Sequence, residues 1–365
     1  NARALIVREL GGPFTFENVI VDDIRSDEAL VKIEASGICR TDLHCAAGHR
    51  PVQTPAVFGH EGAGTVLEVG ENVTGIQPSD KVLLSYSICR TCKQCCSGNR
   101  AYCEKILALN FSGKRQDGSS PLTLPDGKAL FSNFFGQSSF SSLAIVNGSS
   151  LVKVPSDTPL DLFATLGCSM ETGVGAIFNT LDVQPGSTVA VFGVGSLGLY
   201  AIMACKLRQA REIIAVDIQP SRLELAKELG ATATINSSEG DVAEQIRELC
   251  GTNGVEKALD CSGVAKIIET MIDSLGTRGK ACSVGSNADT HISIDVHKHF
   301  VKGTQYVGSH QGDSDPQKMA PLLLKEHSLG RLPLHKVTTF YKVNEFQRAL
   351  DDVESGKTVK AVLTW

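Results

Sequence analysis

The stretch VAVFGVGSLG, residues 189–198, sets the architecture of the second half of this 365-residue chain. Four apolar residues, three of them strand-favouring, run into a glycine-rich turn, and a helical pattern follows the turn. The strand candidates are 189–192, 213–216, 234–236, 257–260 and 280–284, and the helix candidates are 197–206, 221–229, 242–249 and 267–275. Alternation at this spacing predicts βαβ units around a parallel sheet, with Ser221 and Asp241 as helix N-caps.

The three glycines of this turn are spaced as in turns that hold a dinucleotide. Gly193 permits the tight turn, Gly195 lets a pyrophosphate approach the backbone, and Gly198 lets the helix pack on the strand. Asp217 ends the next strand, 19 residues after Gly198, where a carboxylate binds both ribose hydroxyls and repels a 2′-phosphate. The turn therefore predicts NAD, although Asp217 could simply cap a helix and Arg222 could meet a 2′-phosphate.

The rest of the chain has a different pattern. Short alternating runs at 29–35, 64–69 and 81–85 predict strands between turns, with few helices. After about residue 310, helical segments at 316–327 and 344–356 and a strand at 360–364 suggest a return to this first domain. We therefore expect an α/β protein, in which a doubly wound Rossmann domain of residues 169–310 joins an irregular, mainly β domain of residues 1–168 and 311–365.

Composition narrows the partners and the compartment. The net charge of −5 argues against a nucleic-acid partner. The apolar stretch 183–205 is long enough for a membrane span, but four glycines interrupt it, so we expect no membrane partner. The sequence, which starts at Asn1, shows no secretory leader. Seven of the twelve cysteines fall in the first third, which favours metal binding in a reducing, cytoplasmic compartment over disulfides.

Four closely spaced cysteines form one predicted metal site. Two-residue gaps let neighbouring thiolates turn onto one metal, and four thiolates close a tetrahedral zinc shell without room for substrate. This predicts a structural zinc held by Cys89, Cys92, Cys95 and Cys103. An iron–sulfur cluster or free or disulfide-bonded cysteines are the alternatives. Cys96 directly follows Cys95 and leaves open which of the two binds.

Three scattered segments, around Cys39, His60 and Cys168, are weak signals when taken singly, because lone cysteines and histidines are usually structural. In their order and separations, over essentially the whole chain, they resemble the zinc-dependent medium-chain alcohol dehydrogenases. Alcohol dehydrogenase is itself the standard example of a catalytic Cys₂His zinc with an open fourth position. The resemblance implies a GroES-like β domain in which these three residues bind a catalytic zinc.

The resemblance also assigns roles around that zinc. Glu61 would be a carboxylate able to approach the metal, and Asp42 would accept a hydrogen bond from His60 and fix its tautomer. The zinc would act as a Lewis acid on an alcohol. Thr41 would take the alcohol proton and His44 would pass it on, as members of a relay. A helix N-cap is the structural alternative for Thr41.

The remaining cofactor contacts are likewise implied by the resemblance. Arg40 and Lys360 match basic residues that bind the pyrophosphate. Thr172 matches a residue that packs on the nicotinamide, and Val284, with the following glycine, matches a backbone contact to the carboxamide. Arg222 matches a basic residue on the same ribose as Asp217, which keeps NAD as the expected cofactor.

Segments 110–113 and 134–140 resemble the branch that acts on aryl and benzyl alcohols. Phe134, Phe135 and Tyr86 would line an apolar channel, or would simply be core. We expect hydride transfer between NAD and an apolar primary alcohol, such as an aromatic one, or its aldehyde. The alternatives are a hydroxymethyl or hydroxyl group on a larger metabolite or glutathione adduct, and a non-catalytic zinc- and nucleotide-binding relative.

Two further features follow from the resemblance. The spacing between Cys103 and Cys168 is that of the longer family members, so we expect a homo-oligomer, a dimer rather than a tetramer. Ser79 stands where the family usually has glycine, so its turn needs a backbone that serine can adopt.

Overall fold

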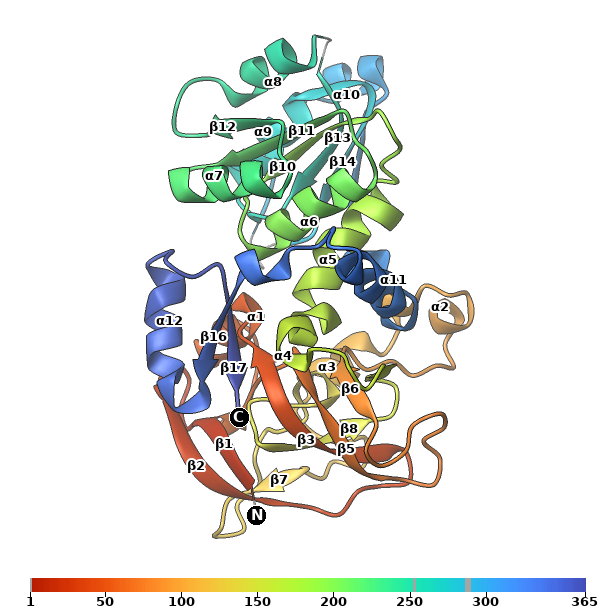
Figure 1. Cartoon of the computed structure of the whole chain (residues 1–365), viewed down its shortest axis with the longest axis vertical. Coiled ribbons are helices and arrows are strands. Elements are labelled where there is room, and N and C mark those ends of the chain that lie inside the picture. Colours follow the sequence, from red (N-terminus) through yellow and green to blue (C-terminus); the bar gives the residue numbers. More distant parts are fainter. Residues whose placement is uncertain (1, 252–253, 286–289) are drawn as a thin grey trace. The chain divides into compact units, whose positions relative to one another are not determined.

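The computed structural model describes residues 2–251, 254–285 and 290–365, which form two compact units (Figure 1). The first, here called the β unit, comprises Asn1–Ser169, Asp315–Glu326 and Leu334–Trp365. The second, the α/β unit, comprises Met170–Ser314 and His327–Pro333. The short segment 327–333 thus groups with the α/β unit, whereas the sequence analysis assigned it to the other domain.

The α/β unit is built on a parallel sheet with the strand order β12-β11-β10-β13-β14-β15 (Figure 1). This is the doubly wound order, so the predicted Rossmann fold is confirmed. Its strands are β10 (Thr188–Phe192), β11 (Glu212–Asp217), β12 (Ala233–Asn236), β13 (Val255–Asp260), β14 (Leu275–Ser283) and β15 (Gln305–Gly308), and its helices are α6 (Ser196–Leu207), α7 (Pro220–Leu229), α8 (Val242–Cys250), α9 (Ala265–Asp273) and α10 (Val296–Lys302). Apolar residues of α8 and α9, among them Ile246 and Met271, bury the sheet residues Ala190 and Ile214.

Helix starts in this unit agree with the prediction at one of two positions. Asp241 is the N-cap of α8, where its side chain accepts a hydrogen bond from the Glu244 N–H at 3.0 Å. Ser221 is not an N-cap. Helix α7 begins one residue earlier at Pro220, with Gln219 as its N-cap, because the fixed φ of proline suits the first helical position.

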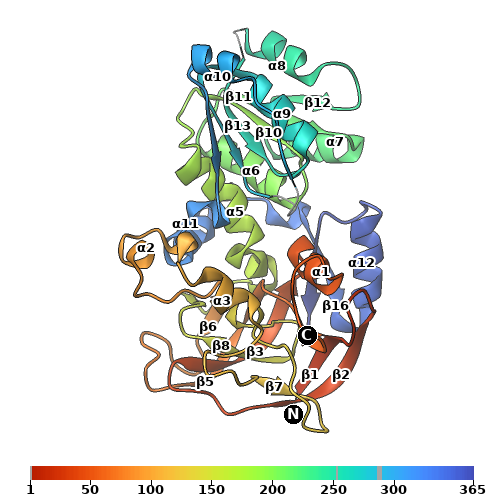
Figure 2. The same ribbon diagram turned by 180° about the vertical axis from the view of Figure 1, so that it is seen from behind.

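The β unit contains two sheets, one with the order β4-β1-β2-β7 and one with the order β16-β17-β3-β5-β6-β9, in which β8 also pairs with β3 (Figure 2). The strands are β1 (Ala2–Val7), β2 (Phe14–Val21), β3 (Glu28–Gly37), β4 (Ala56–Val57), β5 (Gly62–Val69), β6 (Lys81–Leu84), β7 (Leu122–Thr123), β8 (Leu143–Asn147), β9 (Leu151–Val154), β16 (Thr338–Lys342) and β17 (Lys360–Thr364). The short helices include α1 (Arg40–Ala46), α2 (Lys93–Cys96), α3 (Ile106–Phe111), α4 (Leu160–Phe163) and α12 (Phe346–Glu354), and α11 (Pro316–Ser328) follows the return to this unit. The mainly β, irregular character is as expected.

Ser79 has φ of 76°, in the left-handed region that usually favours glycine, so this turn does not have the serine-compatible backbone that we expected. None of the helices in the described part of the chain has the length and apolarity needed to cross a membrane.

Candidate active site

Four potential metal ligands meet at one buried point of the β unit. The ligand atoms of Cys39, His60, Glu61 and Cys168 all lie within 4.8 Å of one another. Cys39 is the N-cap of α1, His60 and Glu61 lie between β4 and β5, and Cys168 follows a 3-10 turn. The structure thus brings together residues separated by 129 positions in the sequence.

The imidazole of His60 is poised for a metal. Its Nδ1 lies 2.9 Å from Asp42 Oδ1, while Nε2, fully buried, makes no hydrogen bond of normal geometry within the described part of the chain. Burial opposes a charge on the ring, but Asp42 and Cys39 raise the pKa of His60 well above its usual value. Because a buried unpaired nitrogen is costly, these surroundings fit a metal cation that would bind Nε2.

The two thiols of this site are coupled to each other. A hydrogen bond from Cys168 lowers the pKa of Cys39 well below its usual value, with additional help from His60. The same hydrogen bond, together with burial, raises the pKa of Cys168. One thiolate therefore forms readily, and two thiolates with one imidazole make the donor set that zinc prefers.

Lys360, the first residue of β17, reaches this cluster from the other end of the chain. Its Nζ lies 2.5 Å from Glu61 Oε2 and donates to the Ile38 carbonyl at 2.9 Å. Burial raises the pKa of Glu61, and the lysine partly offsets this effect. The family resemblance predicts that Lys360 binds the cofactor pyrophosphate, whereas its contact with Glu61 has no signal in the sequence.

The predicted relay residues lie on α1. Thr41 is the second residue of the helix and Cys39 is the N-cap, so the N-cap alternative for Thr41 is wrong. The Thr41 hydroxyl lies 3.9 Å from Cys39 Sγ. His44 is half-buried, and burial, followed by the charge of Arg40, lowers its pKa. The ring of His49, which the sequence analysis missed, meets that of His44 edge-on, with centroids 5.5 Å apart.

A second group of four sulfur ligands lies around α2. Cys89, Cys92, Cys95 and Cys103 have ligand atoms within 4.8 Å of one another. Cys95, rather than Cys96, belongs to this group, because the exposed Cys96 Sγ lies near the backbone carbonyl of Thr91, at 3.6 Å.

Backbone N–H groups of this lobe donate hydrogen bonds to cysteine sulfurs, which stabilises the thiolate form of those residues. The Cys92 N–H donates to Cys89 Sγ at 3.3 Å, and the Cys95 N–H donates to Cys92 Sγ at 3.5 Å. Hydrogen bonds from Thr91 and Cys92 lower the pKa of Cys89 to about 6. Four sulfurs leave no open position, so the arrangement suits a structural metal.

The glycine turn between β10 and α6 has the expected geometry. Gly193 has φ of 83°, and a Cβ on Gly198 would meet the Gly193 carbonyl oxygen at 2.1 Å. A Cβ on Gly195 would meet nothing within 4 Å, so this position is open to an approaching group. Asp217 Oδ2 accepts from the Val194 N–H at 2.8 Å, which holds the carboxylate beside the turn.

Four further residues are predicted to contact the cofactor, and each lies within its own unit. Burial lowers the pKa of Arg222, which lies close enough to Asp217 for the carboxylate to offset part of this effect. Thr172, in α5 (Ser169–Gly175), donates to Gln311 Oε1 at 3.2 Å. Val284 directly follows β14, and Arg40 is the exposed first residue of α1.

Aromatic rings surround the imidazole of His60. The ring of Phe135 stacks on it with centroids 4.4 Å apart, and Phe111 packs against Phe135 at 5.0 Å. Phe134 meets His60 edge-on at 5.6 Å and is fully buried in the core, as is most of Tyr86. Phe135 takes this position with φ of 53°, a left-handed conformation that is unusual for a bulky residue.

Two family models match the chain, one for the alcohol dehydrogenase GroES-like domain over residues 25–156 and one for the zinc-binding dehydrogenase over residues 196–325. Geraniol dehydrogenase of Castellaniella defragrans is 36% identical over 100% of the chain and 98% of the relative. S-(hydroxymethyl)glutathione dehydrogenase of Synechocystis sp. is 32% identical over 99% of each sequence.

Two solved structures support the same family. An alcohol dehydrogenase zinc-binding domain protein from Burkholderia ambifaria has a TM-score of 0.98 at 42% identity, covering 100% of this chain and 98% of its own. Benzyl alcohol dehydrogenase from Acinetobacter calcoaceticus has a TM-score of 0.95 at 38% identity, covering 100% and 99%. Together with the buried Cys/His cluster, these matches show that the chain belongs to the zinc-dependent medium-chain alcohol dehydrogenase family, the oxidoreductases that act on CH–OH groups.

Proposed function

We propose that this enzyme interconverts an apolar, aromatic or allylic primary alcohol and its aldehyde, with NAD and a catalytic zinc bound by Cys39, His60 and Cys168. The observation that carries this proposal is the convergence of these ligands around a buried, unpaired Nε2 of His60. The Phe135 ring stacked on the same imidazole supports an apolar substrate. Relatives named for geraniol and benzyl alcohol support the same substrate class.

Two bound groups would supply the central chemistry: zinc lowers the pKa of an alcohol oxygen, and NAD accepts a hydride from the adjacent carbon. The protein would do the rest. Thr41 accepts the alcohol proton and His44 carries it toward solvent. Asp42 fixes the tautomer of His60, and Glu61 stands ready as a further carboxylate beside the ligands. Phe135 and Phe111 exclude water from the substrate side.

For the cofactor, we infer NAD rather than NADP, because the carboxylate of Asp217 would meet the adenosine ribose and repel a 2′-phosphate. Gly193, Gly195 and Gly198 would admit the pyrophosphate. The remaining contacts proposed for the cofactor come from Arg40, Lys360, Thr172, Arg222 and Val284. A second zinc in the four-cysteine lobe would be structural.

A substrate panel tests the function. NADH formation would be followed at its absorbance with benzyl alcohol, cinnamyl alcohol, geraniol, ethanol, a sugar alcohol and S-(hydroxymethyl)glutathione, with NADP as the cofactor control. We expect the highest kcat/KM with the apolar alcohols and loss of activity after treatment with a strong zinc chelator. A preference for ethanol, a sugar alcohol or the glutathione adduct would overturn the substrate class. Silence with every alcohol would favour a non-catalytic relative.

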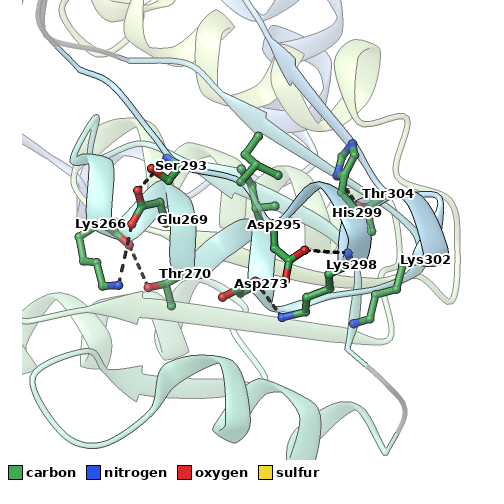
Figure 3. Close-up of a pocket in the computed structure, with 12 residues that line it drawn as sticks. Lys266, Glu269, Thr270, Asp273, Ser293, Asp295, Lys298, His299, Lys302 and Thr304 are labelled. Atoms are coloured by element: carbon green, nitrogen blue, oxygen red, sulfur yellow. Dashed lines mark hydrogen bonds and ion pairs between the residues drawn. The ribbon is translucent and has the colours of Figure 1, made fainter.

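A homodimer is also proposed, through the face of α10 and the edge of β15. Val296, Phe300 and Val301 of α10 are 76%, 78% and 64% exposed. The other face of α10 already has a partner within the chain. There Lys298 forms an ion pair with Asp273 of α9 at 2.8 Å, beside a hollow of about 140 Å³ (Figure 3).

Strand β15 ends the sheet order, so within the described residues one of its edges has no partner strand. A second copy related by a two-fold axis would pair with that edge and cover the apolar face. Phe300→Asp is expected to convert the dimer into monomers in sedimentation equilibrium, whereas the change Val264→Asp at the exposed N-cap of α9 is not. Identical masses for all three proteins would exclude this interface.

The cytoplasmic location stays a proposal. Its support is that the described residues include all twelve cysteines and form no disulfide, which suits a reducing compartment.

A further inference from the structure

The buried side chain of Gln137 holds the segment that carries His60. Its Oε1 accepts from the Gly62 N–H at 3.1 Å, and its Nε2 donates to the His60 carbonyl at 3.0 Å. Nε2 also donates to the Ser85 carbonyl at 3.2 Å. A carbonyl can only accept and an N–H can only donate, so these three partners fix which way the amide points.

Ser85 extends this contact to the other side of the metal cluster. Its hydroxyl, also fully buried, donates to the Gly167 carbonyl at 2.8 Å, and Gly167 directly precedes Cys168. Gly167 packs so closely on β6 that a Cβ there would meet the Leu84 carbonyl oxygen at 1.8 Å. The Gln137 amide and the Ser85 hydroxyl therefore join the His60 segment to the Cys168 segment through hydrogen bonds to backbone groups.

The segment around Gln137 is itself held in an unusual conformation. Phe135 and Ser138 both have positive φ, at 53° and 48°. The Ser138 hydroxyl accepts from the Phe134 N–H at 2.9 Å and donates to the Val57 carbonyl at 2.7 Å. A strained backbone of this kind persists only where the surrounding contacts hold it in place. Here it places the Gln137 side chain against the segment that carries His60.

We infer that Gln137 and Ser85 are positioning residues that set the distance between the His60 and Cys168 ligands and thereby retain the catalytic zinc. The inference rests on the proposed zinc site. Asp42 ties His60 to Cys39 through the imidazole and the backbone, and Gln137 with Ser85 ties His60 to Cys168. Neither residue belongs to the group of potential ligands, so each would act through the ligands that it holds.

The test compares Gln137→Met and Ser85→Ala with a matched control, Ser132→Ala. Ser132 is equally buried, and its hydroxyl accepts from the Leu122 N–H at 3.0 Å, away from the ligand segments. Zinc release from each purified holoenzyme into a colorimetric chelator would be followed over time, and the visible spectrum would be recorded after replacement of the catalytic zinc by cobalt. The zinc in the four-cysteine lobe serves as an internal reference.

In Gln137→Met and Ser85→Ala, we expect the faster-released zinc to leave about tenfold to a hundredfold sooner than in the wild type, because outer hydrogen bonds of metal ligands contribute on this scale. The cobalt spectrum should shift, and the slowly released zinc should behave as in the wild type. Ser132→Ala should leave both release phases and the spectrum unchanged. The inference is wrong if Gln137→Met and Ser85→Ala match Ser132→Ala in release rate and spectrum.

A different outcome would separate this inference from the proposed function. If wild-type protein holds zinc only in the four-cysteine lobe, or if Cys39→Ser removes no zinc, then the catalytic site itself is misassigned. If wild-type protein holds two zinc ions and both Gln137→Met and Ser85→Ala behave like the control, the function stands and the positioning role falls. Should Gln137→Met fail to fold, Ser85→Ala alone decides, because it removes a single hydroxyl.

Discussion

The hydrogen bond between Asp42 and His60 Nδ1 controls the orientation of the imidazole more directly than the other contacts described above. The Asp42 carboxylate accepts from His60 Nδ1, from the Gly59 N–H at 2.9 Å and from the Cys39 N–H at 3.0 Å. Asp42→Asn puts an NH₂ group where a donor now binds, so we expect roughly 10–100-fold weaker binding of the catalytic zinc. Competition with a fluorescent chelator measures this. The exposed change Asp126→Asn is the control, and equal affinities in both variants would contradict the role.

At the scale of single residues, the sequence predicted the proposed ligands and the support that Asp42 gives His60, but not the contacts of Gln137 and Lys360. The cysteine spacings and the segments around His60 are local patterns, and the structure brings these residues together. Gln137 lies 77 positions from His60 and acts through backbone carbonyls, so residue type gives no signal of its contact. The same holds for Lys360, whose partner Glu61 depends on the pairing of β17 with β3.

At the scale of elements, two glycines of the turn between β10 and α6 have different expected roles. Gly198 is required for packing of the helix, and Gly195 is required for cofactor binding. In Gly198→Ala the new Cβ would meet the Gly193 carbonyl oxygen, so α6 must move and the melting temperature should fall by several degrees. In Gly195→Ala the methyl group meets no protein atom within 4 Å but occupies the approach of the pyrophosphate. We expect an unchanged melting temperature and roughly tenfold weaker NAD binding, measured by calorimetry. Normal NAD binding by Gly195→Ala would place the pyrophosphate elsewhere.

The sequence predicted the longer elements of the α/β unit and missed its last strand. Strands β10 and β11 are continuous apolar runs buried on both faces, and such runs are recognisable. The residues of β15 are half-buried or exposed, and their strand conformation comes from pairing with β14. A short edge strand of this kind has no periodicity of its own, so tertiary context decides it.

For the whole molecule, the two metal sites should differ in what they stabilise. Cys39→Ser should remove one zinc ion and abolish activity, while the melting temperature stays within a few degrees of that of the wild type. Cys103→Ser should unfold the lobe around α2 and lower the melting temperature, because a closed structural zinc contributes directly to folding. Metal content and thermal unfolding measure both effects. Equal destabilisation by the two changes would mean that the structural and catalytic roles are misassigned.

A buried ion cluster stabilises the β unit independently of any metal. Arg115 Nε donates to Glu28 Oε1 at 2.8 Å and its Nη1 donates to Asp22 Oδ2 at 2.6 Å, with Arg115 and Glu28 almost fully buried. Arg115→Met leaves the Glu28 carboxylate buried without this partner, which should cost about 3–5 kcal/mol of unfolding free energy in urea titrations. Arg348→Ala breaks an exposed pair with Glu345 and should cost less than about 1 kcal/mol. A loss below that in Arg115→Met would refute the role of the cluster.

The pairing of β17 with β3 also determines when the enzyme can mature during its synthesis. Val362 pairs with Gly37, and Lys360 reaches Glu61 and the Ile38 carbonyl beside the metal ligands. A ribosome makes residues 170–314, and therefore most of the α/β unit, before it makes β17. A nascent chain that already contains Cys39, His60 and Cys168 still lacks β17, the strand that pairs with β3. The α/β unit can consequently fold first, and the proposed zinc site is completed only after β17 has been synthesised.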